Sequence, residues 1–118
     1  MPGGFRKKNF LKEQIENMVY KTRFSDDAEN DYNVIIRYLS QFYPSTPAKF
    51  KKALKKAFSA LTGNPYMYGV CLYNPEYRRV PVSDYIVFYK VIEENETTGI
   101  VEIYRILHGS RDVEKILE

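Results

Sequence analysis

Four arginines and the only histidine are the residues of this sequence best suited to chemistry. They form two groups, made up of Arg78 and Arg79 and then of Arg105, His108 and Arg111. Arginine stabilises negative charge on a phosphate, and histidine can donate or accept a proton, so together they could bind or cleave a phosphodiester. If the two groups lie on neighbouring antiparallel strands, they would meet across the sheet.

Arg105 also has a purely structural interpretation. It shares one alternating face with Val101 and Ile103, so it could point inward and pair with a carboxylate, for which Asp84 and Asp112 are candidates. The candidate catalytic residues are therefore His108, Arg111, Arg78 and Arg79. The candidate target-binding residues are Arg78, Arg79, Arg105, His108 and Arg111.

Other reaction chemistries have little support. One histidine and one cysteine do not make a zinc site of the usual type, and there is no glycine-rich phosphate loop. Ser83, Asp84 and His108 contain the groups of a hydrolase triad, but nothing places Ser83 on a nucleophile elbow. Cys71 lies among apolar residues and is expected in the core. We expect no metal and no cofactor.

Charge is divided unevenly along the 118 residues. Residues 1–64 carry 12 Lys and Arg against 6 Asp and Glu, whereas residues 65–118 carry 6 against 9. A basic first half could meet nucleic acid or an acidic protein segment, or it could simply be a solvated lysine-rich helix face. No apolar run is long enough for a membrane span or a secretion signal, so we expect a cytoplasmic protein with no membrane partner.

The elements that would position these residues follow from periodicity. Residues 1–17 are interpreted as an N-terminal extension, either flexible or a short helix, and 18–118 as one domain. Residues 18–24 alternate as a strand, and Ser25 caps a helix with an apolar stripe from Ala28 to Phe42. Ser45-Thr46-Pro47 is expected to cap and open a second helix, which ends at Gly63-Asn64-Pro65.

The second half predicts a sheet. Residues 66–73 could be a strand or an irregular segment, and 77–82 form a strand that Pro81 places at an edge or a bulge. Residues 85–93 and 100–107 alternate strictly around a polar loop, and 112–117 suggest a short C-terminal helix. The pattern predicts an α+β fold, in which an N-terminal strand, a helix hairpin and antiparallel strands build one twisted sheet.

The sequence resembles the RelE/ParE toxin superfamily of type II toxin–antitoxin systems, whose members are also called plasmid stabilisation proteins. The resemblance rests on Asp84-Tyr-Ile-Val-Phe-Tyr-Lys-Val91 and on Arg105-Ile-Leu-His-Gly-Ser-Arg-Asp112. An Ala-x-x-Asp helix start at Ala28–Asp31 and a Pro-x-x-Ala-x-x-Phe-like second helix agree with it. The resemblance covers residues 18–117 and implies a growth inhibitor that is neutralised by a cognate antitoxin.

The resemblance also divides the possible targets. RelE-like members are ribosome-dependent mRNA endonucleases (mRNA interferases), which carry a catalytic arginine after the tyrosine of the first motif and often a C-terminal tyrosine. Here Ile86 follows Tyr85, and the chain ends Ile116-Leu117-Glu118. Arg111 matches a basic position shared by both branches. The sequence is therefore closer to the ParE-like branch, which is associated with inhibition of DNA gyrase and lacks that nuclease set.

Three activities stay open: a ParE-like gyrase inhibitor that is not an enzyme, a RelE-like endoribonuclease acting on ribosome-bound mRNA, and a degenerate toxin that only binds its antitoxin. We expect the antitoxin to cover the groove between the helix hairpin and the sheet. The expected contact residues are tyrosines of the strands, namely Tyr77, Tyr85, Tyr89 and Tyr104.

Overall fold

The computed structural model describes residues 18–110 of the chain, so the expected N-terminal extension, Arg111 and the expected C-terminal helix lie outside the described residues. Two helices follow a first strand, and three strands follow the helices. In chain order the elements are β1 (Val19–Phe24), α2 (Asp26–Leu39), α3 (Ser45–Gly63), β2 (Arg78–Val82), β3 (Tyr85–Glu93) and β4 (Thr98–His108).

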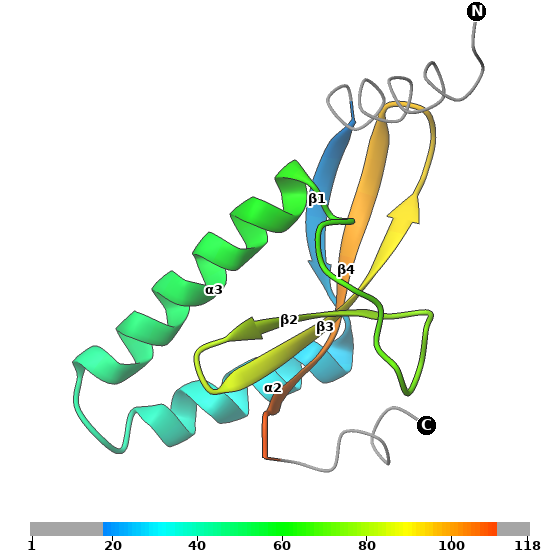
Figure 1. The fold of residues 1–118 in the computed structure, drawn as a ribbon. Coiled ribbons are helices and arrows are strands. Elements are labelled where there is room, and N and C mark those ends of the chain that lie inside the picture. Colours follow the sequence, from blue (N-terminus) through cyan, green and yellow to red (C-terminus); the bar gives the residue numbers. More distant parts are fainter. Residues whose placement is uncertain (1–17, 111–118) are drawn as a thin grey trace, which may run out of the picture.

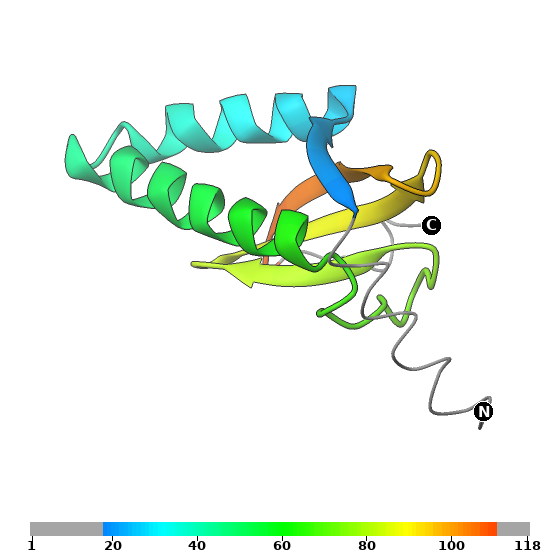
Figure 2. The ribbon, with the colours of Figure 1, turned by 90° about the horizontal axis from the view of Figure 1, so that it is seen from above.

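The strands form one sheet in the order β1-β4-β3-β2. β1 runs parallel to β4, whereas β3 is antiparallel to both of its neighbours, β4 and β2. Both helices lie on the same side of this sheet, as Figures 1 and 2 show. The predicted α+β architecture is confirmed, and β2 is an edge strand, as Pro81 indicated.

The two helices begin and end differently from each other. Ser25 caps α2, because its Oγ accepts a hydrogen bond from the Ala28 amide at 3.1 Å. The expected hydroxyl cap before Pro47 is wrong: α3 already begins at Ser45, and Pro44 occupies the cap position without a side-chain hydrogen bond. The expected inward stripe also fails at Phe42, which lies beyond the end of α2 and is 56% exposed.

The main core lies between the helices and the sheet. Phe50, Leu54 and Leu61 of α3 pack over Val87 and Tyr89 of β3. The buried Tyr89 hydroxyl donates to the Pro65 carbonyl oxygen at 2.7 Å, which satisfies the polar tip of a side chain that is otherwise fully enclosed. Each fully buried aliphatic side chain of this core, such as Leu61 or Val87, contributes about 1.5–3 kcal/mol to folding.

The opposite face of the sheet carries a smaller cluster. Cys71, Phe88 and Leu107 are buried there, with Ile86 and Tyr104 packed against them. Cys71 belongs to the irregular segment between α3 and β2, which is held to the sheet by hydrogen bonds such as Arg79 N to Gly69 O at 3.2 Å. The prediction that Cys71 is a small core residue is confirmed.

A bulge in β4 changes the faces that strict alternation predicts. Phe88 pairs with Arg105 but Tyr89 pairs with Ile103, so Tyr104 is an extra residue on β4. Beyond the bulge, Ile106 turns toward the helices and Leu107 joins the opposite cluster. The sequence-based assignment of Leu107 and Ile106 to faces is therefore wrong, whereas the alternation in β3 is confirmed.

Candidate functional site

Arg105 is held in a two-point ion pair with Asp31 of α2. Its Nε donates to Asp31 Oδ2 at 2.7 Å and its Nη2 donates to Oδ1 at 2.9 Å. The pair is largely withdrawn from solvent, with side-chain exposures of 22% for Arg105 and 11% for Asp31. The hydrogen bond to Asp31 raises the pKa of Arg105, although burial acts in the opposite direction.

The same carboxylate also completes the edge of the sheet. β1 ends at Phe24, opposite Ile103, so β4 continues without a neighbour on that side. There the Ile106 amide donates to Asp31 Oδ2 at 3.0 Å, and the Tyr104 carbonyl accepts from Ser25 Oγ at 2.8 Å. The start of α2 therefore replaces the missing strand. The partner of Arg105 is Asp31 and not Asp84, and Asp112, the other partner that the sequence suggested, lies outside the described residues.

Arg78 is also occupied by contacts within the chain. Its Nη1 donates to the Tyr68 carbonyl at 2.6 Å, and its guanidinium lies 5.2 Å from the centre of the Tyr66 ring. Tyr66 in turn donates to a carboxylate oxygen of Glu93 at 2.5 Å. Burial, followed by this hydrogen bond, raises the pKa of Tyr66. Arg78 thus ties the irregular segment to the sheet.

Arg79 and His108 are the candidates that remain exposed. Within residues 18–110, the Arg79 side chain forms no hydrogen bond or ion pair. The His108 Nδ1 lies 2.7 Å from Ser110 Oγ, and its ring meets Tyr85 edge-on with centroids 5.3 Å apart.

The candidate residues do not converge on one point of the described sheet. Phe88 stands between Arg79 and Arg105 in the same row, so their backbones are separated by two strand spacings, roughly 10 Å. His108 pairs with Tyr85, which is the first residue of β3 and lies three residues before Phe88. Arg111 lies outside the described residues. Among the described candidates, only Arg79 and His108 have side chains free to meet a partner.

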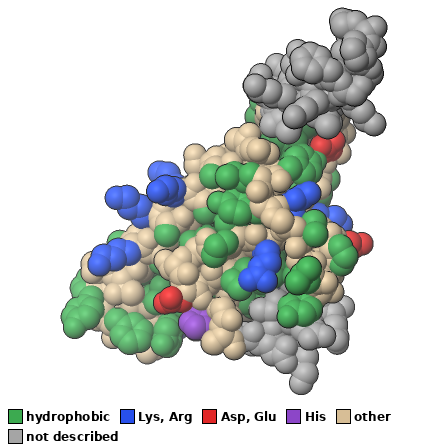
Figure 3. All heavy atoms as spheres, in the orientation of Figure 1, with side chains coloured by type: hydrophobic (Ala, Val, Ile, Leu, Met, Phe, Trp, Pro, Cys, Tyr) green, Lys and Arg blue, Asp and Glu red, His purple; other side chains and the backbone are tan. Residues whose placement is uncertain are grey.

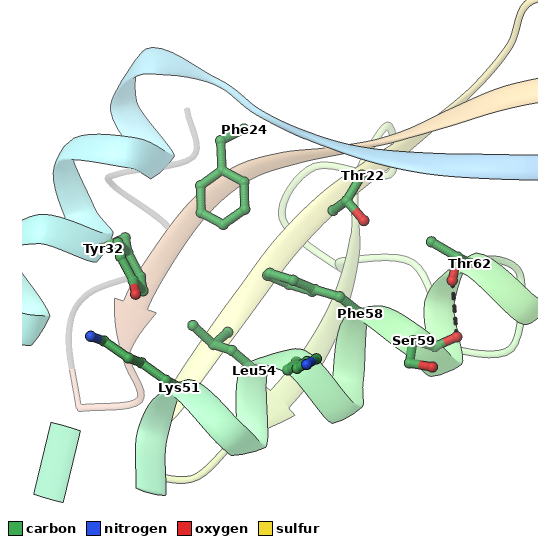
Figure 4. Close-up of a pocket in the computed structure, with 9 residues that line it drawn as sticks. Thr22, Phe24, Tyr32, Lys51, Leu54, Phe58, Ser59 and Thr62 are labelled. Atoms are coloured by element: carbon green, nitrogen blue, oxygen red, sulfur yellow. Dashed lines mark hydrogen bonds between the residues drawn. The ribbon is translucent and has the colours of Figure 1, made fainter. Parts of the chain in front are cut away.

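A groove between β1 and the helix hairpin is the second candidate site. Its volume is about 480 Å³, and Figure 4 shows Phe24, Tyr32, Leu54 and Phe58 pointing into it. Phe24 meets Tyr32 and Phe58 edge-on, with ring centroids 6.2 and 5.6 Å apart. Two exposed lysines of α3, Lys51 and Lys55, also line the groove. An apolar floor bordered by positive charge suits an acidic segment with apolar side chains.

The strand tyrosines do not supply that surface. Tyr85 and Tyr89 are buried in the main core, and Tyr77 stacks on Tyr104 at 4.2 Å on the opposite face of the sheet. The groove residues that sequence reasoning missed are Lys51, Lys55 and the aromatic residues of β1 and α2. The signal that could have found them is the outward position of these lysines beside the apolar stripe of α3.

No metal-binding group of three or more His, Cys, Asp or Glu occurs in residues 18–110. None of the helices in that part of the chain is both long enough and apolar enough to cross a bilayer.

Comparison with known families matches residues 22–113 to the ParE toxin of the type II toxin–antitoxin system parDE. The chain belongs to the ParE toxin family. It is therefore a toxin of a type II toxin–antitoxin system within the RelE/ParE superfamily, as its motifs indicated. No curated protein sequence matches it.

Solved toxin–antitoxin structures share the fold of this ParE-family toxin. The chromosomal ParDE system from P. aeruginosa superposes with a TM-score of 0.60 at 15% identity, covering 79% of this chain and 97% of that one. The RelBE2 toxin–antitoxin complex from Mycobacterium tuberculosis superposes with a TM-score of 0.50 at 22% identity, covering 77% and 99%. Both neighbours are described as toxin–antitoxin systems, and the likeness shows a shared fold.

Proposed function

We propose that this toxin is a ParE-like growth inhibitor that acts in the cytoplasm on DNA gyrase and has no nuclease centre of its own. The observation that supports this proposal most directly concerns Ile86, which occupies the position where RelE-like members carry a catalytic arginine. Ile86 packs against the apolar cluster of Phe88, Leu107 and Cys71. An apolar side chain there supplies neither proton transfer nor charge stabilisation, and losing one such group costs a nuclease orders of magnitude in rate.

The remaining arginines support the same proposal. Arg105 is engaged by Asp31 and Arg78 by Tyr68, so neither guanidinium is free to stabilise a phosphate without breaking a contact. Arg79 and His108 lie on different rows of the sheet, with Arg79 opposite Phe88 and His108 opposite Tyr85. General acid–base catalysis requires such groups within hydrogen-bond reach of one substrate.

The experiment compares two activities of one full-length preparation. Purified toxin is added to a gyrase supercoiling reaction and, separately, to ribosomes stalled on a defined message. We expect loss of supercoiling and an intact message. An intact supercoiling activity together with cleaved message would contradict the proposal and favour the RelE-like alternative.

That alternative, a ribosome-dependent mRNA endonuclease, has one observation in its favour. The α3 lysines Lys49, Lys51, Lys52, Lys55 and Lys56 are all exposed, and Arg79 is exposed as well. Such a surface could contact ribosomal phosphates, and binding of that kind weakens steeply as salt increases. Its test is cleavage of the ribosome-bound message, and loss of that cleavage in Arg79→Ala.

We further propose that the cognate antitoxin occupies the groove between β1 and the helix hairpin. The apolar floor of the groove and its two lysines favour an acidic segment that folds on binding. Lys51→Glu/Lys55→Glu should weaken antitoxin binding at least tenfold in a titration followed by calorimetry. The matched control is Lys52→Glu/Lys56→Glu, which changes the net charge equally on the same helix outside the groove. If both double variants weakened binding equally, the effect would come from the overall charge of the toxin, and the groove assignment would be contradicted.

A further inference from the structure

A second hollow lies at the far end of the helix hairpin, away from the β1 groove. It has a volume of about 680 Å³ and lies between the α2–α3 joint and the β2–β3 turn. Its walls carry Tyr38 from the end of α2, Phe42 and Tyr43 from the joint, and Tyr85 and His108 from the sheet. Figure 3 shows hydrophobic side chains gathered at this tip, with an acidic side chain and the single histidine at their border.

Three aromatic side chains at this tip are exposed to solvent instead of packing into the core. Tyr38 is 52%, Phe42 56% and Tyr43 75% exposed. Tyr38 and Phe42 nevertheless hold each other in a fixed edge-on arrangement, with ring centroids 5.3 Å apart. Exposed, preordered aromatic residues around a concavity are typical of contact surfaces, because they bury a large area at a small entropic cost.

The charge of the hollow limits what it can hold. Asp84 is its one lining carboxylate, and no described residue donates a hydrogen bond to the Asp84 side chain. Burial raises the pKa of Tyr85, and the nearby Tyr38 and Asp84 raise it further. Among the described residues the hollow has no lining lysine or arginine, so a phosphate group would meet the Asp84 carboxylate with His108 as the one basic side chain beside it.

We propose that this hollow is a binding pocket for an arginine side chain presented by a protein partner. A guanidinium is planar, so it can stack on one exposed ring face of the Tyr38–Phe42 pair while its edge donates to the Asp84 carboxylate. The compact, strongly hydrated ammonium of lysine lacks the plane for stacking. The pocket is separate from the groove proposed for the antitoxin. The proposal does not depend on whether the toxin acts on gyrase or on ribosome-bound mRNA.

The test is a titration of isotopically labelled full-length toxin with three short peptides, followed by amide chemical shifts. The peptides are acetyl-Ala-Arg-Ala-amide and its lysine and citrulline counterparts, in which citrulline keeps the planar shape and removes the charge. We expect shifts confined to the α2–α3 joint, Asp84, Tyr85 and His108. The arginine peptide should bind at least threefold more tightly than either counterpart.

Two variants separate the charge from the aromatic wall. Asp84→Asn keeps a residue suited to a turn and should weaken binding of the arginine peptide by about three- to tenfold, as expected for a partly exposed charged pair. Phe42→Ala should weaken it similarly through lost stacking. Glu94→Gln, which removes an equal charge at the other end of β3, should leave it unchanged.

Several outcomes would overturn the pocket. Shifts spread over the surface, or equal affinity for arginine and citrulline, would remove the role of charge. Unchanged binding by Asp84→Asn would do the same. If a short oligonucleotide, titrated in the same way, bound at these residues more tightly than the arginine peptide, the hollow would be assigned to nucleic acid instead.

Discussion

Replacing Arg105 by alanine should destabilise the fold of the toxin rather than remove a residue that contacts its target. The substitution removes both hydrogen bonds of the Asp31 pair, at 2.7 and 2.9 Å, and leaves a carboxylate that is 11% exposed with the Ile106 amide as its remaining donor. Breaking a fully buried pair costs about 3–5 kcal/mol. Because Arg105 keeps 22% of its exposure, we expect a somewhat smaller loss, about 2–3 kcal/mol.

A loss of this size is easily measured. In a domain of this length, 1 kcal/mol changes the Tm by roughly 4–8 °C, so Arg105→Ala should lower it by roughly 8–24 °C. The assay is thermal and urea denaturation of refolded toxin, run beside a growth assay with induced expression. Asp31→Asn should be destabilising as well, and the double variant should lose less than the sum of the single losses, because the two residues form one interaction.

The reasoning fails if Arg105→Ala melts at the wild-type temperature and still abolishes toxicity. That result would make Arg105 a target-binding residue with a dispensable ion pair. Arg111→Ala provides the contrast, since we expect it to retain the wild-type Tm and to reduce toxicity. Loss of stability in the Arg111 variant would contradict that assignment.

Three further predictions concern the scaffold. Gly99→Ala would place a Cβ 2.6 Å from the buried Tyr20 ring and 3.0 Å from the Ile92 carbonyl oxygen, so urea denaturation should show a loss of about 1–3 kcal/mol, and an unchanged midpoint would refute the tight contact. Ser83 has a φ of 54°, so Ser83→Gly should raise stability by up to about 1 kcal/mol relative to Ser83→Ala, and a lower midpoint for glycine would contradict strain at this turn. Burial raises the pKa of Tyr89 to about 12 from an ordinary 10.0. The folded state therefore favours neutral Tyr89, and its contribution is complete below pH 10 and lost as the pH rises toward 12. Tyr89→Phe should lower stability at pH 7 by about 1–2 kcal/mol, through the unpaired Pro65 carbonyl, and should show a smaller decline between pH 10 and 12.

The sequence predicted the elements well because their patterns are local. Alternation in residues 85–93 and the Ser25 cap depend on neighbours within a few residues, and both are confirmed. The prediction that Phe42 points inward was wrong for a geometric reason. It continues the helical spacing of α2, but the helix ends at Leu39, and the hairpin tip extends past the sheet.

The site was harder to predict because its contacts are distant in sequence. Asp31 and Arg105 are 74 residues apart, and their pairing depends on where β1 stops beside β4. The bulge at Tyr104 has no glycine or proline to mark it, so strict alternation gave the wrong face for Ile106. Charge and residue type identified the basic residues, but only the fold shows which of them are engaged.

The most direct test of the central proposal is induced expression of the toxin without antitoxin, with nucleoid morphology and message integrity followed in the same culture. A gyrase inhibitor predicts filamentous cells, DNA-damage signalling and intact translated message. Rapid loss of translated message with normal nucleoids would contradict the account and assign the toxin to the endonucleases.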